Sequence, residues 1–94
     1  MNLPKSVKIG GLTYRVKQTS NVSNGVDGEI NPQTLKIKLR PMNKAAMART
    51  LLHEMLHGIH WELGYTEHDE KQIDALAGAL YALIVDNPGI FIDG

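Results

Sequence analysis

The feature that most constrains this chain is the run LLHEMLHG, which covers residues 51–58. It consists largely of residues that favour helices, and it places His53 and His57 four positions apart. On an α-helix, residues four apart lie on one face, one turn above the other. Both imidazoles can therefore reach a single ion at the roughly 2.0–2.1 Å that is typical of zinc–nitrogen bonds. The run predicts a helix with two zinc ligands on one face.

Glu54 directly follows the first of these histidines and lies about 100° around the helix from it. From there its carboxylate can take a proton from water that the ion activates, without itself becoming a ligand. The chain has no cysteine, so disulfides and thiolate ligands are excluded and any further ligand must be a histidine or a carboxylate. Glu54 is therefore the predicted general base of a zinc site.

The bulk composition is that of an ordinary small globular protein. The 94 residues are 43% hydrophobic and 21% charged, which predicts one domain over residues 1–94. The net charge is zero with neutral histidines, so we expect no nucleic-acid partner. The first residues lack the apolar core of a signal peptide, and no later run is long enough for a membrane span, so we expect no membrane partner.

The first half of the chain has the alternation of strands. Apolar and polar residues alternate on both sides of the pair Gly10-Gly11, which predicts a β-hairpin over residues 7–17. Residues 19–28 are rich in Ser, Asn and Gly and predict a loop. A third strand is expected to approach through a turn at residues 31–34 and to run over residues 35–39, where Leu and Ile alternate with Lys.

The second half has the spacing of two helices. Asn43 is the predicted N-cap of the first, and Gly64 its predicted stop. A capping box from Thr66 to Asp69 is expected to open the second, which Asn87 and the following Pro and Gly end. The expected core stripes are Ala45, Ala48, Leu52, Leu56, Ile59 and Leu63 on the first helix and Ile73, Leu76, Ala77, Leu80, Leu83 and Ile84 on the second. The fold class is α+β, with about three antiparallel-type strands followed by two packed helices.

A catalytic zinc site usually needs a third protein ligand besides the two histidines. Glu70 and Asp74 are four apart on one flank of the second helix and are expected to point toward the first. Their spacing resembles that of gluzincin metallopeptidases, which implies that Glu70 is the ligand and that Asp74 supports a ligand histidine. Asp74 remains the reserve ligand, because a simple antiparallel hairpin would bring it near the level of His57.

Other polar residues are weaker candidates. His60 is seven residues after His53, about 10.5 Å along a straight helix, which is too far to share one ion. Glu67 and His68 are expected to lie in the cap of the second helix.

Two stretches of this chain resemble a known group of proteins. The segments TLLHEMLHGIH and EKQIDALAGALYALIVDNP, within residues 50–88, resemble small HExxH metallopeptidase-like proteins of phages and mobile elements that are related to the ImmA/IrrE type. The resemblance implies a minimal zincin-like fold, Zn²⁺ held by His53, His57 and Glu70, and Glu54 as the base. It also implies a bacterial or phage cytoplasmic setting. This chain is shorter than the larger members of that group, so we expect no second subdomain that would enclose a substrate.

The leading hypothesis is a zinc-dependent metallopeptidase that acts on a protein or peptide substrate. The strand at residues 35–39, if it forms a sheet edge, could pair with the substrate backbone. Tyr65 and His68 are candidates for stabilising the oxyanion, whereas Tyr81 is expected in the core. The alternative is a binding module that zinc stabilises, which docks a regulatory or phage protein and cuts nothing. The sequence does not indicate an oligomeric state.

Overall fold

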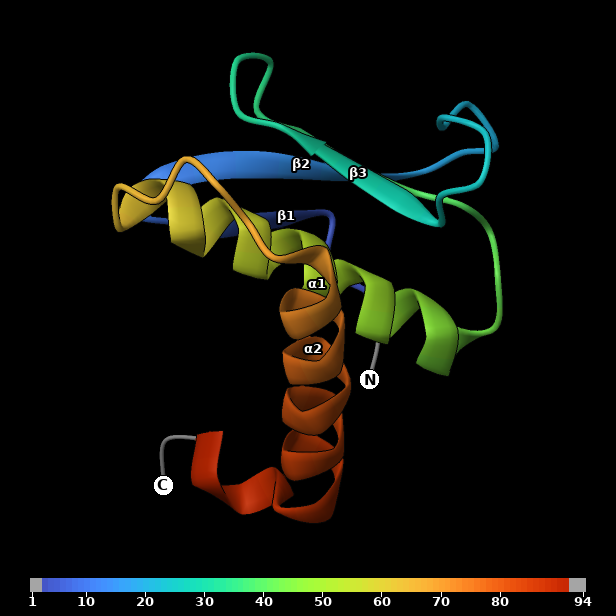
Figure 1. Ribbon diagram of the computed structural model, residues 1–94. Coiled ribbons are helices and arrows are strands. Elements are labelled where there is room, and N and C mark those ends of the chain that lie inside the picture. The colour runs from blue at the N-terminus through green and yellow to red at the C-terminus, as the bar shows by residue number, and fades with distance from the viewer. Residues whose placement is uncertain (1–2, 92–94) are drawn as a thin grey trace.

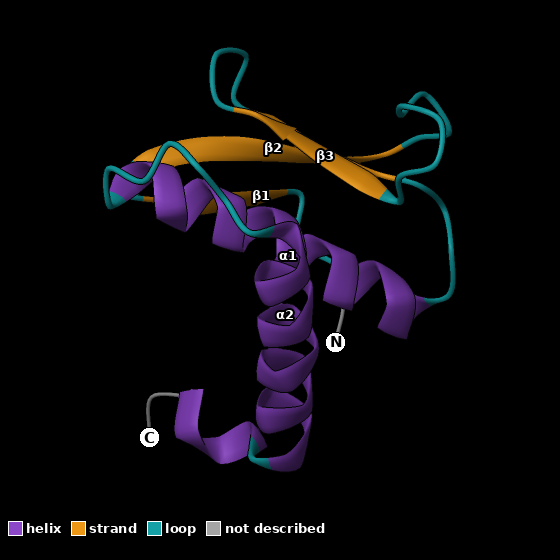
Figure 2. Ribbon diagram, in the orientation of Figure 1, coloured by secondary structure: helices purple, strands orange, loops and turns teal. Residues whose placement is uncertain are grey.

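The computed structural model describes residues 3–91, which form a mixed four-stranded sheet and two helices. The strands are β1 (Ser6–Ile9), β2 (Leu12–Gln18), β3 (Gly28–Asn31) and β4 (Lys36–Leu39). The helices are α1 (Lys44–Glu62) and α2 (Glu70–Asp86), followed by the short 3-10 helix η1 (Pro88–Phe91). The predicted α+β class is confirmed, with the strands before the helices (Figures 1 and 2).

The β-hairpin predicted around the glycine pair is present. β1 and β2 are antiparallel, with Ile9 opposite Leu12 at the turn. Gly10 and Gly11 have φ angles of 58° and 84°. A two-residue turn of this kind needs positive φ at both positions, which glycine adopts without strain.

The prediction of about three antiparallel-type strands is only roughly met, because the sheet has four strands and one of its three pairings is parallel. The sheet order is β1-β2-β4-β3, and β2 and β4 are parallel. The side chain of Asn31 accepts hydrogen bonds from the backbone N–H groups of Gln33 and Thr34, and Leu35 adopts a φ of 57°. This tight turn separates β3 from β4 and folds them into an antiparallel pair. β4 is therefore a central strand, and β3 is the edge.

Both ends of α1 are those that the sequence predicts. The side chain of Asn43 accepts a hydrogen bond of 2.8 Å from the backbone N–H of Ala46. At the other end, Gly64 has a φ of 89°, and the N–H groups of Gly64 and Tyr65 donate to the carbonyls of Trp61 and His60. These two bonds form a Schellman motif, which satisfies carbonyls that the end of a helix leaves unpaired.

The start of α2 lies later than the capping-box prediction. Asp69 is itself the N-cap, because its side chain accepts a hydrogen bond of 3.1 Å from the N–H of Gln72. The chain from Gly64 to the cap therefore stays non-helical, and Glu70 is the first residue of α2. This longer connection lets α2 begin above the middle of α1 (Figure 1).

α1 is the central element of the fold, because it packs on the sheet with one side and on α2 with another. The cluster on the sheet side contains Ile9, Tyr14, Ile37, Leu39 and Leu51, whereas the cluster on the α2 side contains Leu56, Ile73 and Ala77. The predicted single stripe on α1 is thus partly wrong. Ala45, Ile59 and Leu63 are exposed, and Met47 and Leu51 are buried instead, since the helix is contacted from two directions.

A glycine brings the part of α1 that carries His53 and His57 close to the sheet. A Cβ atom at Gly58 would lie 2.8 Å from Cδ1 of Ile9 and 3.3 Å from Cδ1 of Ile30. Only a residue without a side chain leaves this space to the two isoleucines. Gly58 therefore sets the distance between α1 and the strands, directly beside His57.

None of the helices in residues 3–91 combines the length and the apolar character that crossing a membrane requires.

Candidate metal centre

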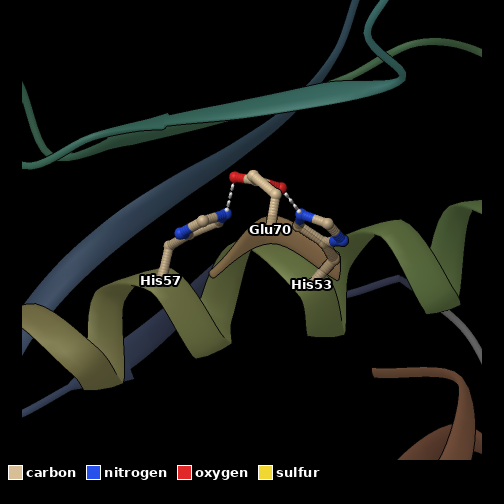
Figure 3. A group of neighbouring side chains, drawn as sticks. All are labelled: His53, His57 and Glu70. Carbon is tan, nitrogen blue, oxygen red and sulfur yellow. Dashed lines mark hydrogen bonds and ion pairs between the residues drawn. The ribbon is translucent and has the colours of Figure 1, made fainter. Parts of the chain in front are cut away.

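Three of the predicted site residues meet at one point. His53 and His57 lie one turn apart on α1, with their ring centroids 5.1 Å from each other. Glu70 reaches between them from the start of α2: its Oε2 lies 3.0 Å from Nε2 of His53, and its Oε1 lies 2.6 Å from Nε2 of His57 (Figure 3). One ligand atom from each residue lies within 4.8 Å of the others, so the group could hold a metal ion.

The donor set fits a zinc-type ion. Two imidazole nitrogens and one carboxylate oxygen are the usual protein ligands of a catalytic site, in which donors around a tetrahedral ion lie about 3.3 Å apart. The carboxylate of Glu70 bridges both Nε2 atoms at similar separations. The Glu70 side chain keeps 68% of its surface exposed, so one side of the group faces solvent. This side is where a further ligand can approach an ion.

Asp74 supports the first histidine, as the spacing to Glu70 implied. Its Oδ1 lies 3.2 Å from Nδ1 of His53, on the ring nitrogen that faces away from Glu70. A carboxylate in this position fixes the orientation of the ring and makes the other nitrogen a better ligand. Asp74 does not come to the level of His57, as a simple hairpin would require, because α2 leaves α1 at a steep angle (Figure 1).

His68 supports the second histidine, a role that the sequence did not indicate. Its Nδ1 lies 2.7 Å from Nδ1 of His57, and its Nε2 lies 3.0 Å from the carbonyl oxygen of Tyr65. The carbonyl can only accept, so Nε2 of His68 donates to it; in a neutral ring, Nδ1 then accepts from Nδ1–H of His57. Nε2 of a neutral His57 is thereby left with a free electron pair, which is the form that binds metal ions.

Burial shifts the pKa values of two residues at this site. Burial raises the pKa of Glu54 to about 7 from its ordinary value of 4.5, His53 lowers it, and the carboxylates of Glu70 and Glu29 raise it further. The Glu54 side chain lies in the cavity wall beside the histidines, and the residue is only 7% exposed. The pKa of His57 is lowered, mainly by burial, although Glu70 opposes this effect. Burial thus favours the neutral form of His57.

A cavity of about 820 Å³ opens beside the three ligand candidates. Its walls come from β3, from α1 and from the first half of α2. Arg49 and Trp61 also line it, and the sequence reasoning missed both. The sequence could have indicated both, because they repeat the spacing of His53 and His57: Arg49 is four residues before the pair, and Trp61 is four residues after it. The site is therefore part of a longer groove along α1.

The remaining candidates lie outside this cavity. His60 is not part of the ligand group, as predicted; its Nδ1 lies 2.7 Å from the carbonyl oxygen of Leu56. Glu67 is exposed in the loop before α2. Within residues 3–91, the lining of the cavity includes neither Tyr65 nor His68, the two candidates for an oxyanion donor, and Tyr81, which was expected in the core, does not line it either.

Comparisons of this chain with models of protein families, with curated proteins and with solved structures each found no match.

Proposed function

We propose that this chain is a zinc-dependent metallopeptidase of the gluzincin type, built on a minimal zincin-like fold. The observation that carries the proposal is the convergence of the Nε2 atoms of His53 and His57 on the Glu70 carboxylate. Two nitrogens and one oxygen suit Zn²⁺, and a cavity is open beside them.

Glu54 has the surroundings of a general base. Its carboxyl lies in the cavity wall next to His53, and in the metal-free protein burial raises its pKa to about 7, which makes it a stronger base than an ordinary exposed carboxylate. When bound, zinc would polarise the scissile carbonyl and make water a better nucleophile. Glu54 takes the proton from that water and passes it to the leaving amine. Asp74 and His68 hold the two ligand rings in place.

The edge strand β3 offers a place for the substrate backbone. Residues Gly28, Glu29 and Ile30 of this strand line the cavity, and among the described strands β3 pairs with β4 alone. An extended protein or peptide chain can add to such an edge by backbone hydrogen bonds. This replaces the prediction that residues 35–39 provide the edge, since β4 lies between β2 and β3. A cytoplasmic setting in a bacterium or phage-infected cell completes the proposal.

The test is Glu54→Gln in zinc-loaded protein. This change keeps the volume and all three ligands but removes the base. Incubation with a peptide library and mass spectrometry should show a loss of cleavage of about 10²–10⁴-fold, with unchanged zinc content. Glu67→Gln is the matched control, because Glu67 is exposed outside the cavity and should leave cleavage unchanged. Equal cleavage by wild type and Glu54→Gln would refute the role of Glu54.

A second candidate function is a zinc-stabilised module that binds a regulatory or phage protein without cutting it. The observation in its favour is that Tyr65 and His68, the two candidates for an oxyanion donor, do not line the cavity in the described part of the chain. In that case zinc content stays at one per chain, no library peptide is cleaved by the wild type, and Glu54→Gln changes neither zinc content nor partner binding.

A further inference from the structure

α1 turns four regularly spaced side chains toward the cavity. These are Arg49, His53, His57 and Trp61, each four residues from the next. At 1.5 Å per residue, consecutive members are about 6 Å apart along the helix. The ligand candidates occupy the middle of this row, with Arg49 on one side of them and Trp61 on the other.

Arg49 is the single cation among the cavity-lining side chains of residues 3–91, apart from the histidines. Three of the lining carboxylates already have partners. Glu29 accepts a hydrogen bond of 3.0 Å from the N–H of Ser23, whereas Glu70 and Asp74 contact the histidines. Arg49 forms no ion pair within the described residues. Asp27 and Glu54 also line the cavity, and neither forms an ion pair with Arg49 in the described part of the chain, so its charge is not paired with a protein carboxylate.

α2 leaves space for this guanidinium. A Cβ atom at Gly78 would lie 2.8 Å from Nη2 of Arg49, so any larger residue would push the guanidinium away. Glycine inside a helix costs about 1 kcal/mol relative to alanine. Gly78 is one turn after Asp74, and the carboxylate of Asp74 turns to His53 instead of Arg49. The absence of a side chain at Gly78 therefore leaves room for the Arg49 guanidinium beside α2.

We propose that Arg49 binds a carboxylate of the peptide that occupies this cavity and thereby selects acidic substrates. The guanidinium can bind a carboxylate through two parallel hydrogen bonds, a stronger and more directional contact than an ammonium group gives. Arg49 is one to two helical turns from the ligand pair, about 6–12 Å, which an extended chain spans in roughly two to four residues. The carboxylate is an Asp or Glu side chain at that separation from the scissile bond, or the C-terminal carboxylate of the substrate. Only the statement that a peptide bond is cleaved near Arg49 rests on the proposed function.

Binding can be measured without catalysis, because Trp61 is the one tryptophan of the chain and lines the same cavity. We would titrate zinc-loaded Glu54→Gln protein with acetylated six-residue alanine peptides and follow tryptophan fluorescence. At each position, a peptide with Asp is paired with the otherwise identical peptide with Asn. One further pair consists of the all-alanine peptide with a free C-terminus and the same peptide with an amidated C-terminus. In this protein we expect the acidic member of one pair to bind at least tenfold more tightly than its neutral partner, and the pair that shows this identifies the source of the carboxylate.

Arg49→Gln should reduce that preference to less than twofold, whereas Arg49→Lys should retain part of it. Lys44→Gln is the charge-matched control, since it removes one cation from α1 outside the cavity and should keep the full preference. A preference that survives Arg49→Gln would assign the carboxylate to the zinc ion and overturn the proposal. Equal binding of all pairs, or binding of none, would overturn it as well.

The proposed function fails separately from this inference. Peptide binding with an Arg49-dependent preference but no cleavage by the wild type would refute the peptidase and keep the carboxylate site. Cleavage by the wild type without any preference for acidic peptides would keep the peptidase and refute the carboxylate site at Arg49.

Discussion

The two sides of α1 are packed very differently. On the sheet side, five residues are almost completely buried: Ile9, Tyr14, Ile37, Leu39 and Leu51 have 0–5% of their surface exposed. On the α2 side, the buried cluster consists of Leu56, Ile73 and Ala77, and within residues 3–91 α2 contacts no strand. Leu76 and Leu83 of α2 remain 42% and 46% exposed. The sheet and α1 form the apolar body of the protein, whereas α2 is attached to it through a small apolar seam.

The candidate metal centre lies across this weaker seam. Two of its ligands come from α1 and the third from the first turn of α2, and Asp74 adds a second polar contact between the helices. A bound ion would therefore join α2 to the body and compensate for the few apolar contacts. Stability and metal binding should be coupled at α2 and nearly independent at the sheet. The predictions below test this difference.

The largest effect should come from a cavity in the body. Leu51→Ala removes a side chain that is 4% exposed between α1 and the sheet, and should lower the free energy of unfolding by about 4 kcal/mol. Ile73→Ala, in the smaller cluster, should cost only about 2 kcal/mol because α2 can shift to close the gap. Urea titrations of both variants in excess chelator measure the two losses. Similar losses would show that the seam is as well packed as the body.

Zinc should stabilise the α2 side selectively. A ligand that binds only the folded state stabilises it by about 4 kcal/mol at a thousandfold excess over its Kd. We expect about one zinc per chain and a lower melting temperature after chelation. In hydrogen exchange, the added protection should fall on Glu70–Asp86, not on β4. The absence of zinc together with an unchanged melting curve in chelator would refute the metal site. Equal added protection in α2 and in the sheet would refute the claim that zinc stabilises the α2 side selectively.

The two carboxylates of α2 should differ in their effect on zinc affinity. Glu70 contacts both Nε2 atoms, whereas Asp74 contacts only the far nitrogen of His53. Glu70→Ala should therefore weaken zinc binding by well over 100-fold, which corresponds to more than about 2.7 kcal/mol. Asp74→Ala should cost 10–100-fold, the usual range for a group that orients a ligand. Competition with a chromophoric chelator measures both; a larger loss in Asp74→Ala would make Asp74 the ligand.

These positions show what the sequence can specify. The His-Glu-x-x-His spacing and the Glu70/Asp74 pair both follow from helix geometry, which is local and regular. The same rule could have found Arg49 and Trp61 by extending the spacing by one step in each direction. His68 could not be assigned this way, because it reaches His57 from a loop.

The order of the strands in the sheet also could not be predicted from the sequence. Alternation at residues 35–39 correctly predicts a strand with one buried face, and Ile37 and Leu39 are fully buried. It does not determine the neighbouring strands, because every pairing of such a strand buries the same face. The parallel pairing of β2 with β4 and the edge position of β3 follow instead from the turn at Asn31 and from the long connection before β3.

The pKa of Glu54 should make the stability of the metal-free protein depend on pH. The folded state keeps a proton on Glu54 up to about pH 7, whereas the unfolded state releases it near 4.5. Between these values the folded state binds more protons, so this group lowers the free energy of unfolding as the pH rises. Glu54→Gln should therefore be more stable than the wild type at pH 8, by about 3 kcal/mol, and nearly equal to it at pH 4. Urea titrations across this range in chelator would contradict the assignment if the difference is constant.

The smallest effect should separate two histidines that lie next to each other. His68 and His60 have ring centroids 5.2 Å apart, but only His68 contacts His57. His68→Ala removes the acceptor for Nδ1–H of His57, so the ring loses its fixed orientation. Because this bond joins two neutral rings, it should contribute less than the Asp74 carboxylate, and we expect a loss of zinc affinity of about tenfold.

His60→Ala is the matched control, since it removes a ring of the same size from the same aromatic group. Its own hydrogen bond goes to the carbonyl of Leu56, so zinc affinity should change by less than about twofold. Both variants can be titrated with the same chromophoric chelator. Equal losses would show that packing of the aromatic group orients His57, and a loss far above 100-fold in His68→Ala would make His68 itself a ligand. A tenfold loss confined to His68→Ala would show that the loop before α2 positions one ligand of α1, so that the segment joining the helices takes part in the metal centre as α2 does.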